Sequence, residues 1–258
     1  MNKITAIFLN FNTEELLTYN VFHIYDYVDE IIVANTGGSA GTVLSRLLKM
    51  SKIRLITLPR EYLLDRANCG WSCDEAATRN YLTNQASNDW IVHIDTDEFL
   101  SIEFLNFIAR SNLYHEAYSV ERLHFESVNT MISFADKSFV CNFYNRNKGF
   151  TWLNYNHNYT HATLVLDEYR DNRGIPVSLR YLHIYKREKK ITDKQYRNLQ
   201  QRIATVPFIV EHLYFLNPFS FSHGDANGIK QSRKSYFSKY ISQDIQAVMA
   251  ALEDKYVY

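Results

Sequence analysis

Short apolar runs alternate with segments of helical spacing over the first part of the chain. We predict buried strands at residues 4–9, 30–34, 53–58 and 90–94. Helices are predicted at residues 16–21, 43–50, 76–86 and 102–109, where apolar side chains recur every three or four residues. Strands that alternate with helices indicate an α/β fold with a mainly parallel sheet and helices on both faces.

The start of the third predicted helix carries a recognisable signal. Ser72 and Glu75 have the S-x-x-E form of a capping box, in which each residue satisfies a backbone N–H group of the first turn. We therefore expect these two residues to open the helix that runs through Ala86.

The pattern changes after residue 115. Strands are predicted at residues 118–125, 139–144, 162–166 and 178–185, without long helices between them, so an antiparallel section is expected. From Lys186 onward the chain turns polar and helical. Apolar side chains then share one helical face near the end of the chain, which predicts an amphipathic C-terminal helix packed on the body.

Three carboxylates follow the fourth predicted strand at once, at Asp95, Asp97 and Glu98. Isolated charges are costly to bury, so these residues bind a cation, cap a helix or lie in solvent. Residues two apart on an extended segment point the same way, and paired carboxylates suit magnesium or manganese. A glycine-rich turn, residues 35–42, follows the second strand. Both features lie at carboxyl ends of strands, where parallel α/β sheets bind ligands.

Composition narrows the classes of function. The 258 residues hold 28 Lys and Arg against 28 Asp and Glu, so the net charge is zero and disfavours nucleic acid as a partner. Three cysteines give no disulfide framework, which fits a reducing compartment. We find no signal peptide and no apolar run of the ~18 residues that span a bilayer. We therefore expect a cytoplasmic protein, with peripheral membrane contact through the C-terminal helix left open.

Four segments together resemble the nucleotide-sugar glycosyltransferases of the GT-A fold, near glycosyltransferase family 2. They are residues 4–10 (ITAIFLN), 28–42 (VDEIIVANTGGSAGT), 71–80 (WSCDEAATRN) and 94–100 (IDTDEFL). The last is similar to the D-x-D element of that family. The chain departs from the family at Asn35 and Ala40, where relatives often have an acid, and the resemblance after residue 115 is loose.

The resemblance implies a domain organisation and a reaction. Residues 1–190 would form a GT-A-like, Rossmann-like catalytic domain, with a nucleotide-sugar-binding half at 1–115 and an acceptor-side half at 116–190. Residues 191–258 would form a helical C-terminal appendage. The implied function is metal-dependent, inverting transfer of a sugar from a nucleoside-diphosphate sugar, with UDP expected, to a carbohydrate or glycoconjugate acceptor.

The resemblance also implies roles for individual residues. The metal ligands, to Mn²⁺ or Mg²⁺, would be Asp95, Asp97 and His183. The donor would be bound by Asn10, Asn35, Thr36, Arg79, Asp95 and Lys186. The catalytic residues would be Asp97 and a general base. Four acids lie where relatives place acceptor-side residues: Glu126, Asp136, Asp167 and Glu168. We choose Asp167 or Glu168, since that pair follows the strand predicted at 162–166.

Each of these roles has a structural alternative. Arg79 could form an ion pair with Asp95 or Asp97, His183 could be a strand residue bonded to backbone, and Lys186 could be solvated. Two other functions also stay open: a non-catalytic carbohydrate-binding protein on a GT-A scaffold, and a phosphatase of the haloacid-dehalogenase type. The phosphatase carries its D-x-D element on the first strand, whereas here the element lies near residue 95.

Overall fold

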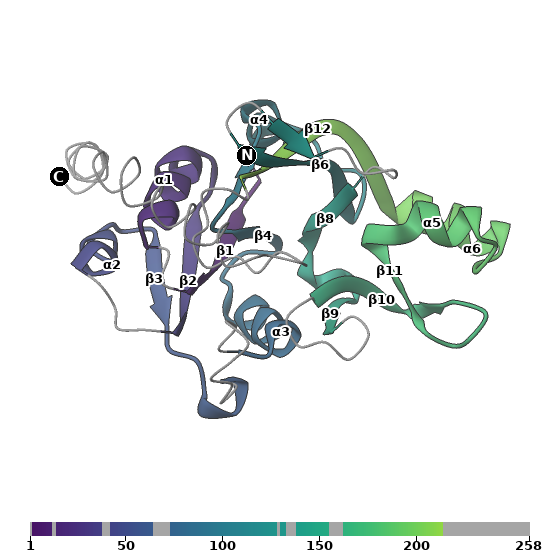
Figure 1. Ribbon diagram of the computed structural model, residues 1–258, viewed down its shortest axis with the longest axis horizontal. Coiled ribbons are helices and arrows are strands. Elements are labelled where there is room, and N and C mark those ends of the chain that lie inside the picture. The colour runs from purple at the N-terminus through teal and green to yellow at the C-terminus, as the bar shows by residue number, and fades with distance from the viewer. Residues whose placement is uncertain are drawn as a thin grey trace.

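The computed structural model describes residues 2–11, 14–37, 42–63, 73–127, 130–132, 138–154 and 162–213. Over these residues the chain forms a large nine-stranded sheet and a small three-stranded sheet, with helices packed against them (Figure 1). The α/β fold class expected from the sequence is confirmed.

The first part of the large sheet is parallel. It contains β1 (Ile4–Phe11), β2 (Glu30–Gly37), β3 (Ile53–Ile56) and β4 (Trp90–Asp95) in the spatial order β3-β2-β1-β4. The four strands predicted from apolar runs are therefore present. The chain builds outward from β1 to β2 and β3, then returns to the other side of β1 with β4. The strand order thus reverses between β1 and β4, as in Rossmann-like sheets.

Helices cover both faces of this sheet, as the sequence pattern predicts. On one face lie α1 (Glu14–Ile24), α2 (Thr42–Leu47) and α4 (Ile102–Arg110), which share a core cluster with Phe8 of β1. On the other face lies α3 (Glu75–Gln85), which shares a second cluster with Ile7. The side chains of neighbouring residues of β1 therefore pack into core clusters on opposite faces of the sheet, as expected for a strand buried on both sides.

The second part of the large sheet mixes directions. Next to β4 comes β8 (Ser138–Asn145), antiparallel to it, followed by β6 (Ala117–Ser127), antiparallel to β8. A parallel strand, β12 (Ile203–Leu213), then pairs with β6, and β5 (Glu98–Leu100) runs antiparallel at its edge. The short β7 (Thr130–Ile132) also pairs with β6. The antiparallel section predicted after residue 115 is thus confirmed.

The small sheet has the order β11-β10-β9, all antiparallel. It consists of β9 (Phe150–Asn154), β10 (Ala162–Arg170) and β11 (Pro176–Ser178), and its apolar side chains join the core cluster on the α3 face. Short helical turns connect the elements: η1 (Tyr25–Tyr27), η2 (Arg60–Tyr62) and η3 (Arg146–Lys148). No helix among the described residues is long and apolar enough to cross a bilayer.

The prediction of a strand at residues 178–185 is wrong. After β11 the chain forms the turn η5 (Leu179–Tyr181) and the short helix α5 (Leu182–Arg187). Leu179, Leu182 and Tyr185 all pack into the core of the α3 face. Their three-residue spacing is helical, whereas the alternating aromatic residues of this segment suggest a strand.

The expectation of helical structure from Lys186 onward is confirmed for α6 (Asp193–Arg202) but wrong for residues 203–213. The latter form β12, within the sheet, so the chain returns from α6 to the main core. Pro207 lies in the register break between Thr205 and Ile209, where a residue without an N–H group interrupts no pairing. Residues 214–258, with the predicted amphipathic helix, lie outside the described residues.

Candidate active site

The carboxylates that follow β4 lie in a tight turn, which we call the carboxylate turn (residues 95–98). Asp95 ends β4, Thr96 and Asp97 form the turn, and Glu98 begins β5. The expectation that Asp95 and Asp97 share one side of an extended segment is therefore wrong, because the chain reverses between the two strands. The side chain of Asp95 is 34% exposed, whereas Asp97 is only 4% exposed. The two carboxylates therefore differ in their exposure to solvent.

Buried side chains from other elements hold this turn in place. From α1, the Nδ2 amide of Asn20 donates to the carbonyl oxygens of Thr96, at 3.0 Å, and Glu98, at 2.9 Å. The carboxylate of Glu98 accepts from the backbone N–H of Asp95 at 3.3 Å and forms an ion pair with Arg122 of β6. Since Asn20 and Glu98 are almost fully buried, the turn is fixed by the core rather than by solvent-exposed contacts.

The helix α3 brings Arg79 to the carboxylate turn. The N-cap of α3 is Asp74, whose side chain accepts from the N–H of Ala77 at 3.0 Å, so the predicted capping box opened by Ser72 is wrong. Ser72 itself lies outside the described residues. Glu75 is consequently the first residue of the helix, one turn before Arg79, and is available as its partner.

Arg79 joins two carboxylates. Its Nε donates to Oε1 of Glu75 at 2.8 Å, and its Nη2 donates to Oδ1 of Asp95 at 2.6 Å. The guanidinium also lies 4.8 Å from the ring centroid of Trp152, and it is 5% exposed. The ion pair with Asp95 that the sequence left open for Arg79 is therefore present.

Burial and the neighbouring charges shift the acid–base behaviour of this triad. Burial raises the pKa of Glu75 to about 7; the negative charge of Asp95 adds to this effect and Arg79 opposes it. Burial alone would lower the pKa of Arg79, but Asp95 and Glu75 raise it above its ordinary value. Arg79 is thus a permanent cation whose charge is shared between the helix and the carboxylate turn.

A neutral histidine lies close to this triad. Burial, together with the positive charge of Arg79, lowers the pKa of His93 well below its usual range. Its Nε2 is 3.0 Å from the hydroxyl of Thr83, and its ring stacks on Tyr144. His93 is therefore part of the packing beneath the site and remains uncharged.

Polar side chains at the ends of β1 and β2 lie beside the carboxylate turn. In the sheet, Leu9 pairs with both Ala34 and Asp95, so the next residue, Asn10, lies at the same edge as the turn. The Nδ2 of Asn10 is 3.4 Å from Oδ1 of Asn35, and the hydroxyl of Thr36 donates to the Asn10 carbonyl at 3.1 Å. The structure thus brings together five of the predicted donor-binding residues: Asn10, Asn35, Thr36, Arg79 and Asp95.

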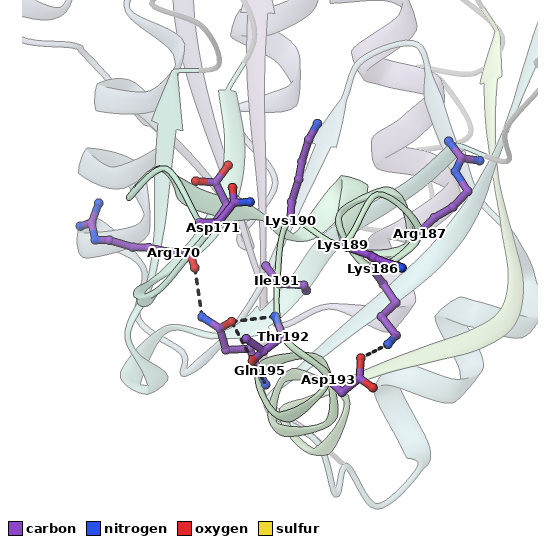
Figure 2. A pocket seen from close by; sticks show the side chains of 11 residues that line it. Arg170, Asp171, Lys186, Arg187, Lys189, Lys190, Ile191, Thr192, Asp193 and Gln195 are labelled. Atoms are coloured by element: carbon purple, nitrogen blue, oxygen red, sulfur yellow. Dashed lines mark hydrogen bonds and ion pairs between the residues drawn. The ribbon is translucent and has the colours of Figure 1, made fainter.

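The other predicted site residues lie on different elements. Lys186 of α5 forms an ion pair with Asp193 at the rim of an open cavity of about 570 Å³ (Figure 2). His183, also on α5, packs its ring against Phe139 at a centroid distance of 5.5 Å. Glu168 is exposed on β10 and forms an ion pair with Arg202.

Asp167 is exposed on the same strand, β10. This strand begins at the site, since the N–H of Ala162 donates to Oε2 of Glu75 at 3.2 Å. At ~3.3 Å per residue, Asp167 lies roughly 16 Å further along the strand. The structure therefore does not bring Asp167 to the carboxylate turn.

Carboxylate oxygens are the donors that magnesium and manganese prefer, so the chemistry of Asp95 and Asp97 fits such a cation. However, in the part of the chain that the structure describes, no three His, Cys, Asp or Glu side chains form a group able to hold a metal ion. His183 in particular is not brought together with the two aspartates. A cation at this site would take its remaining ligands from substrate and water.

Two arginines near the carboxylate turn were not singled out from the sequence. Arg122 of β6 pairs with Glu98, and Arg180 of η5 lies within electrostatic range of Arg122, Glu98 and Asp95. They come from segments far from residue 95 in sequence and carry no local motif. The pairing of β12 with both β6 and β5, and the packing of η5 against β8, bring them to the turn.

Comparisons with known proteins give likenesses in structure alone. No protein family matches the chain, and no curated protein matches it. The chain is similar to S. aureus TarS 1-349, with 11% identity over 94% of this chain and 74% of that one, at a TM-score of 0.41. A complex of TarS 1-349 with UDP-GlcNAc gives the same identity and TM-score over 86% of this chain and 60% of that one.

The chain is also similar to a putative glucose-1-phosphate thymidylyltransferase from Bacillus anthracis in complex with a sucrose. The identity is 10% over 92% of this chain and 96% of that one, at a TM-score of 0.39. A longer TarS chain is covered over only 43% of its length. At these levels of similarity the neighbours' ligands carry no inference for this chain.

Proposed function

We propose that this protein is a glycosyltransferase that moves a sugar from a nucleoside-diphosphate sugar, with UDP as the expected nucleotide, to a carbohydrate-type acceptor. The observation that supports the proposal best is the carboxylate turn. It lies where the strand order reverses between β1 and β4, and open α/β sheets bind their ligands in the crevice at such a point. The resemblance of four sequence segments to GT-A glycosyltransferases assigns the kind of ligand.

In this proposal the ends of β1 and β2 bind the nucleoside. The side chains of Asn10 and Asn35 offer both amide donors and carbonyl acceptors, and Thr36 adds a hydroxyl. Asn35 replaces the acid that relatives often carry, so hydrogen bonds to the base or ribose would involve a neutral group. Because an amide both donates and accepts hydrogen bonds, Asn35 is compatible with more than one nucleobase, and experiment identifies which one binds.

Asp95 and Asp97 would hold the divalent cation, together with diphosphate oxygens and water. When bound, such a cation acts as a Lewis acid that stabilises the charge growing on the leaving diphosphate. Arg79 orients Asp95 through the 2.6 Å hydrogen bond to its Oδ1. Because Arg79 stays protonated, it also adds a fixed positive charge near the leaving group. We leave His183 out of the ligand set, since it lies on α5 against Phe139.

The general base is proposed as Asp167 or Glu168, as expected from the sequence. The acceptor hydroxyl must meet the sugar carbon of the donor held at the carboxylate turn, so this role would require β10 and the turn to come closer in the complex than they are here. Loss of a general base lowers the rate by ~10²–10⁴-fold. Asp167→Asn and Glu168→Gln would therefore each be compared with wild type for kcat, and near-wild-type rates for both would remove this pair from the mechanism.

The experiment that tests the proposed function is turnover. The protein is incubated with UDP-sugars and Mn²⁺, and release of UDP is measured with and without oligosaccharide acceptors. We expect slow hydrolysis of one donor without acceptor and faster UDP release with the right acceptor class. Asp97→Asn should abolish both, whereas Asp193→Asn, which changes a carboxylate on α6, should keep them. Nucleotide binding without release of UDP from any donor would contradict the proposal.

A second candidate function is a non-catalytic carbohydrate-binding protein on the same scaffold. The observation that favours it is the engagement of the carboxylates, since Oδ1 of Asp95 is held by Arg79 and Asp97 is 4% exposed. In this case the turn would serve stability alone. Glycan binding that survives Asp97→Asn, with no nucleotide binding, would favour this candidate.

A further inference from the structure

A second cavity, which we call the arginine cavity, lies between the α5–α6 segment and the large sheet. Its volume is about 360 Å³, and it is lined by side chains from β6, β8, η5, α5, α6 and β12. The polar groups that matter here are Ser119, Arg180 and His183, and the apolar wall includes Phe139, Leu182 and Ile203. A few polar groups that converge within a mostly apolar wall are typical of small-ligand sites.

Arg180 is the unusual member of this lining. Its guanidinium carbon lies 5.4 Å from the ring centroid of Tyr181, but it makes no hydrogen bond or ion pair with any described residue, and its Nε is buried without a partner. Burial lowers the pKa of Arg180 and the like charge of Arg122 lowers it further, while the negative charges of Glu98 and Asp95 offset only part of this effect. A largely buried guanidinium is costly unless an anion balances it.

His183 lines the same cavity and is also incompletely bonded. Its Nε2 is buried and has no hydrogen-bond partner among the described residues. Ser119, which is 5% exposed, adds a hydroxyl from β6. A guanidinium, an imidazole and a hydroxyl are all able to donate hydrogen bonds, so the cavity offers several donors for one acceptor group.

The larger basic hollow of Figure 2 lacks this feature. There Lys186 is paired with Asp193, and Lys190 is paired with Glu188. These cations are already balanced by neighbouring carboxylates at the surface. The arginine cavity differs because the Nε of its cation is buried without a hydrogen-bond partner and the guanidinium forms no ion pair with a described residue.

We propose that the arginine cavity is an oxyanion-binding site, in which Arg180 and His183 bind a phosphate or carboxylate group separate from the donor nucleotide. The donor fork of an arginine matches both groups. The wall of Phe139, Leu182 and Ile203 would contact the body of the ligand. The volume is at the low end of the ~300–1,000 Å³ of ligand pockets, so the ligand is a small molecule or the terminal unit of a larger one.

The charges of Glu98 and Asp95 act on Arg180, so the site lies beside the carboxylate turn. The oxyanion could therefore belong to a substrate that also reaches this turn, or to a free molecule that binds alone. The binding itself does not depend on sugar transfer. It can be tested without any donor, and its failure would leave the proposed glycosyltransferase function untouched.

The test is a titration of the full chain with inorganic phosphate at constant ionic strength, followed by thermal melting and by calorimetry. A ligand that binds only the folded state raises the melting temperature, so we expect a saturable increase. Arg180→Gln and His183→Gln should each weaken phosphate binding by on the order of tenfold or more, the value of a hydrogen bond to a charged group. The matched control is Lys190→Gln, which removes a cation paired with Glu188 and should leave the affinity unchanged.

A further variant guards against a general loss of folding. Because Arg180 lacks a partner in the ligand-free protein, Arg180→Met should melt at the same or a higher temperature without phosphate, yet lose the response to phosphate. A lower melting temperature for this variant, or equal phosphate affinity in wild type and Arg180→Gln, would overturn the proposal.

The source of the oxyanion is resolved by a second titration in the presence of UDP and Mn²⁺. If the effects of UDP and phosphate on melting add, the site is separate, as proposed. If phosphate competes with UDP, Arg180 instead binds the diphosphate of the donor, and the proposed separate site is wrong. A phosphorylated glycoside that binds more tightly than phosphate, and loses this gain in Arg180→Gln, would identify a substrate as the source.

Discussion

The substitution Glu75→Gln tests how the charges around Arg79 are balanced. Glu75 is buried and accepts hydrogen bonds from Arg79 and from the backbone of Ala162. Burial, the leading cause, raises its pKa from an ordinary 4.5 to about 7. Glutamine has the shape of the protonated acid, so the variant represents the neutral form at every pH.

The sign of the effect follows from the direction of the shift. An acid whose pKa is higher in the folded state than in the unfolded state stabilises the folded state at pH values below its unfolded-state pKa. For Glu75 this stabilisation is full below pH 4.5 and is lost as the pH rises through the folded-state pKa of about 7. One pKa unit corresponds to ~1.4 kcal/mol, so the full loss is about 3 kcal/mol. Relative to Glu75→Gln, wild type should therefore lose about 3 kcal/mol of unfolding free energy between pH 4.5 and 8.

The assay is urea denaturation of both proteins at several pH values, followed by tryptophan fluorescence. A matched control is Glu30→Gln. Burial acts to raise the pKa of Glu30, but hydrogen bonds from Ser87, Thr5 and Arg54 outweigh it and lower the pKa. For this residue wild type should gain stability relative to the variant as the pH rises. If wild type also gains stability relative to Glu75→Gln between pH 4.5 and 8, Arg79 holds Glu75 as a carboxylate and the reasoning is wrong.

Three further substitutions are tested by urea denaturation, two at the frame of the site and one in the turn that precedes β9. Asn20→Ala leaves two buried carbonyls of the carboxylate turn without a hydrogen-bond donor. We expect the free energy of unfolding to fall by ~1–3 kcal/mol for each carbonyl. A total loss below ~1 kcal/mol would contradict the anchoring role of Asn20. Arg79→Met removes the cation between Glu75 and Asp95 and should cost ~3–5 kcal/mol, with unchanged stability as the contrary result. Gly149→Ala places a side chain on a backbone with φ +77°, where no atom lies within 4 Å of the new Cβ. Backbone strain alone should therefore lower the free energy of unfolding by ~1 kcal/mol. A stabilised variant would show that the backbone relaxes.

The first half of the fold was predictable because its signals are local. The central parallel strands are buried on both faces and read as nearly continuous apolar runs, such as residues 31–34. The acids of the carboxylate turn were visible for the same reason, since three carboxylates directly after an apolar run stand out in the sequence. Its geometry was not visible, because the pairing of β5 with β12 that reverses the chain after Asp97 depends on residues more than 100 positions away.

The errors in the second half have physical causes too. At residues 178–185 the side chains fit both a strand-like alternation and a helical spacing. The structure is helical because that spacing buries Leu179 and Tyr185. At residues 203–213 the polar and helical pattern expected after Lys186 does not continue, because this segment pairs with β6 and β5, and its proline lies in a register break. The ligand role of His183 came from the resemblance, whereas the alternative, a strand residue bonded to backbone, followed the first error.

Arg122 and Arg180 show what a single sequence does not reveal. Neither arginine belongs to a motif, and each acquires its neighbours only through long-range strand pairing and packing. The partner that Arg180 lacks among the described residues is visible only when burial and hydrogen bonds are known together. The resemblance to glycosyltransferases was carried by the first half of the chain, where relatives bind the nucleotide, so it gave little guidance for this region.

The most direct test of the central claim is thermal melting with nucleoside diphosphates, in the presence of Mn²⁺, Mg²⁺ or a chelator. We predict that one diphosphate, with UDP expected, raises the melting temperature only with metal, that Asp97→Asn abolishes this response and that Asp193→Asn retains it. At a ligand concentration of 100 times Kd, binding adds ~2.7 kcal/mol to the stability of the folded state, which thermal melting detects readily. If no diphosphate changes the melting temperature with any metal, the carboxylate turn is not a donor site, and the glycosyltransferase account is contradicted.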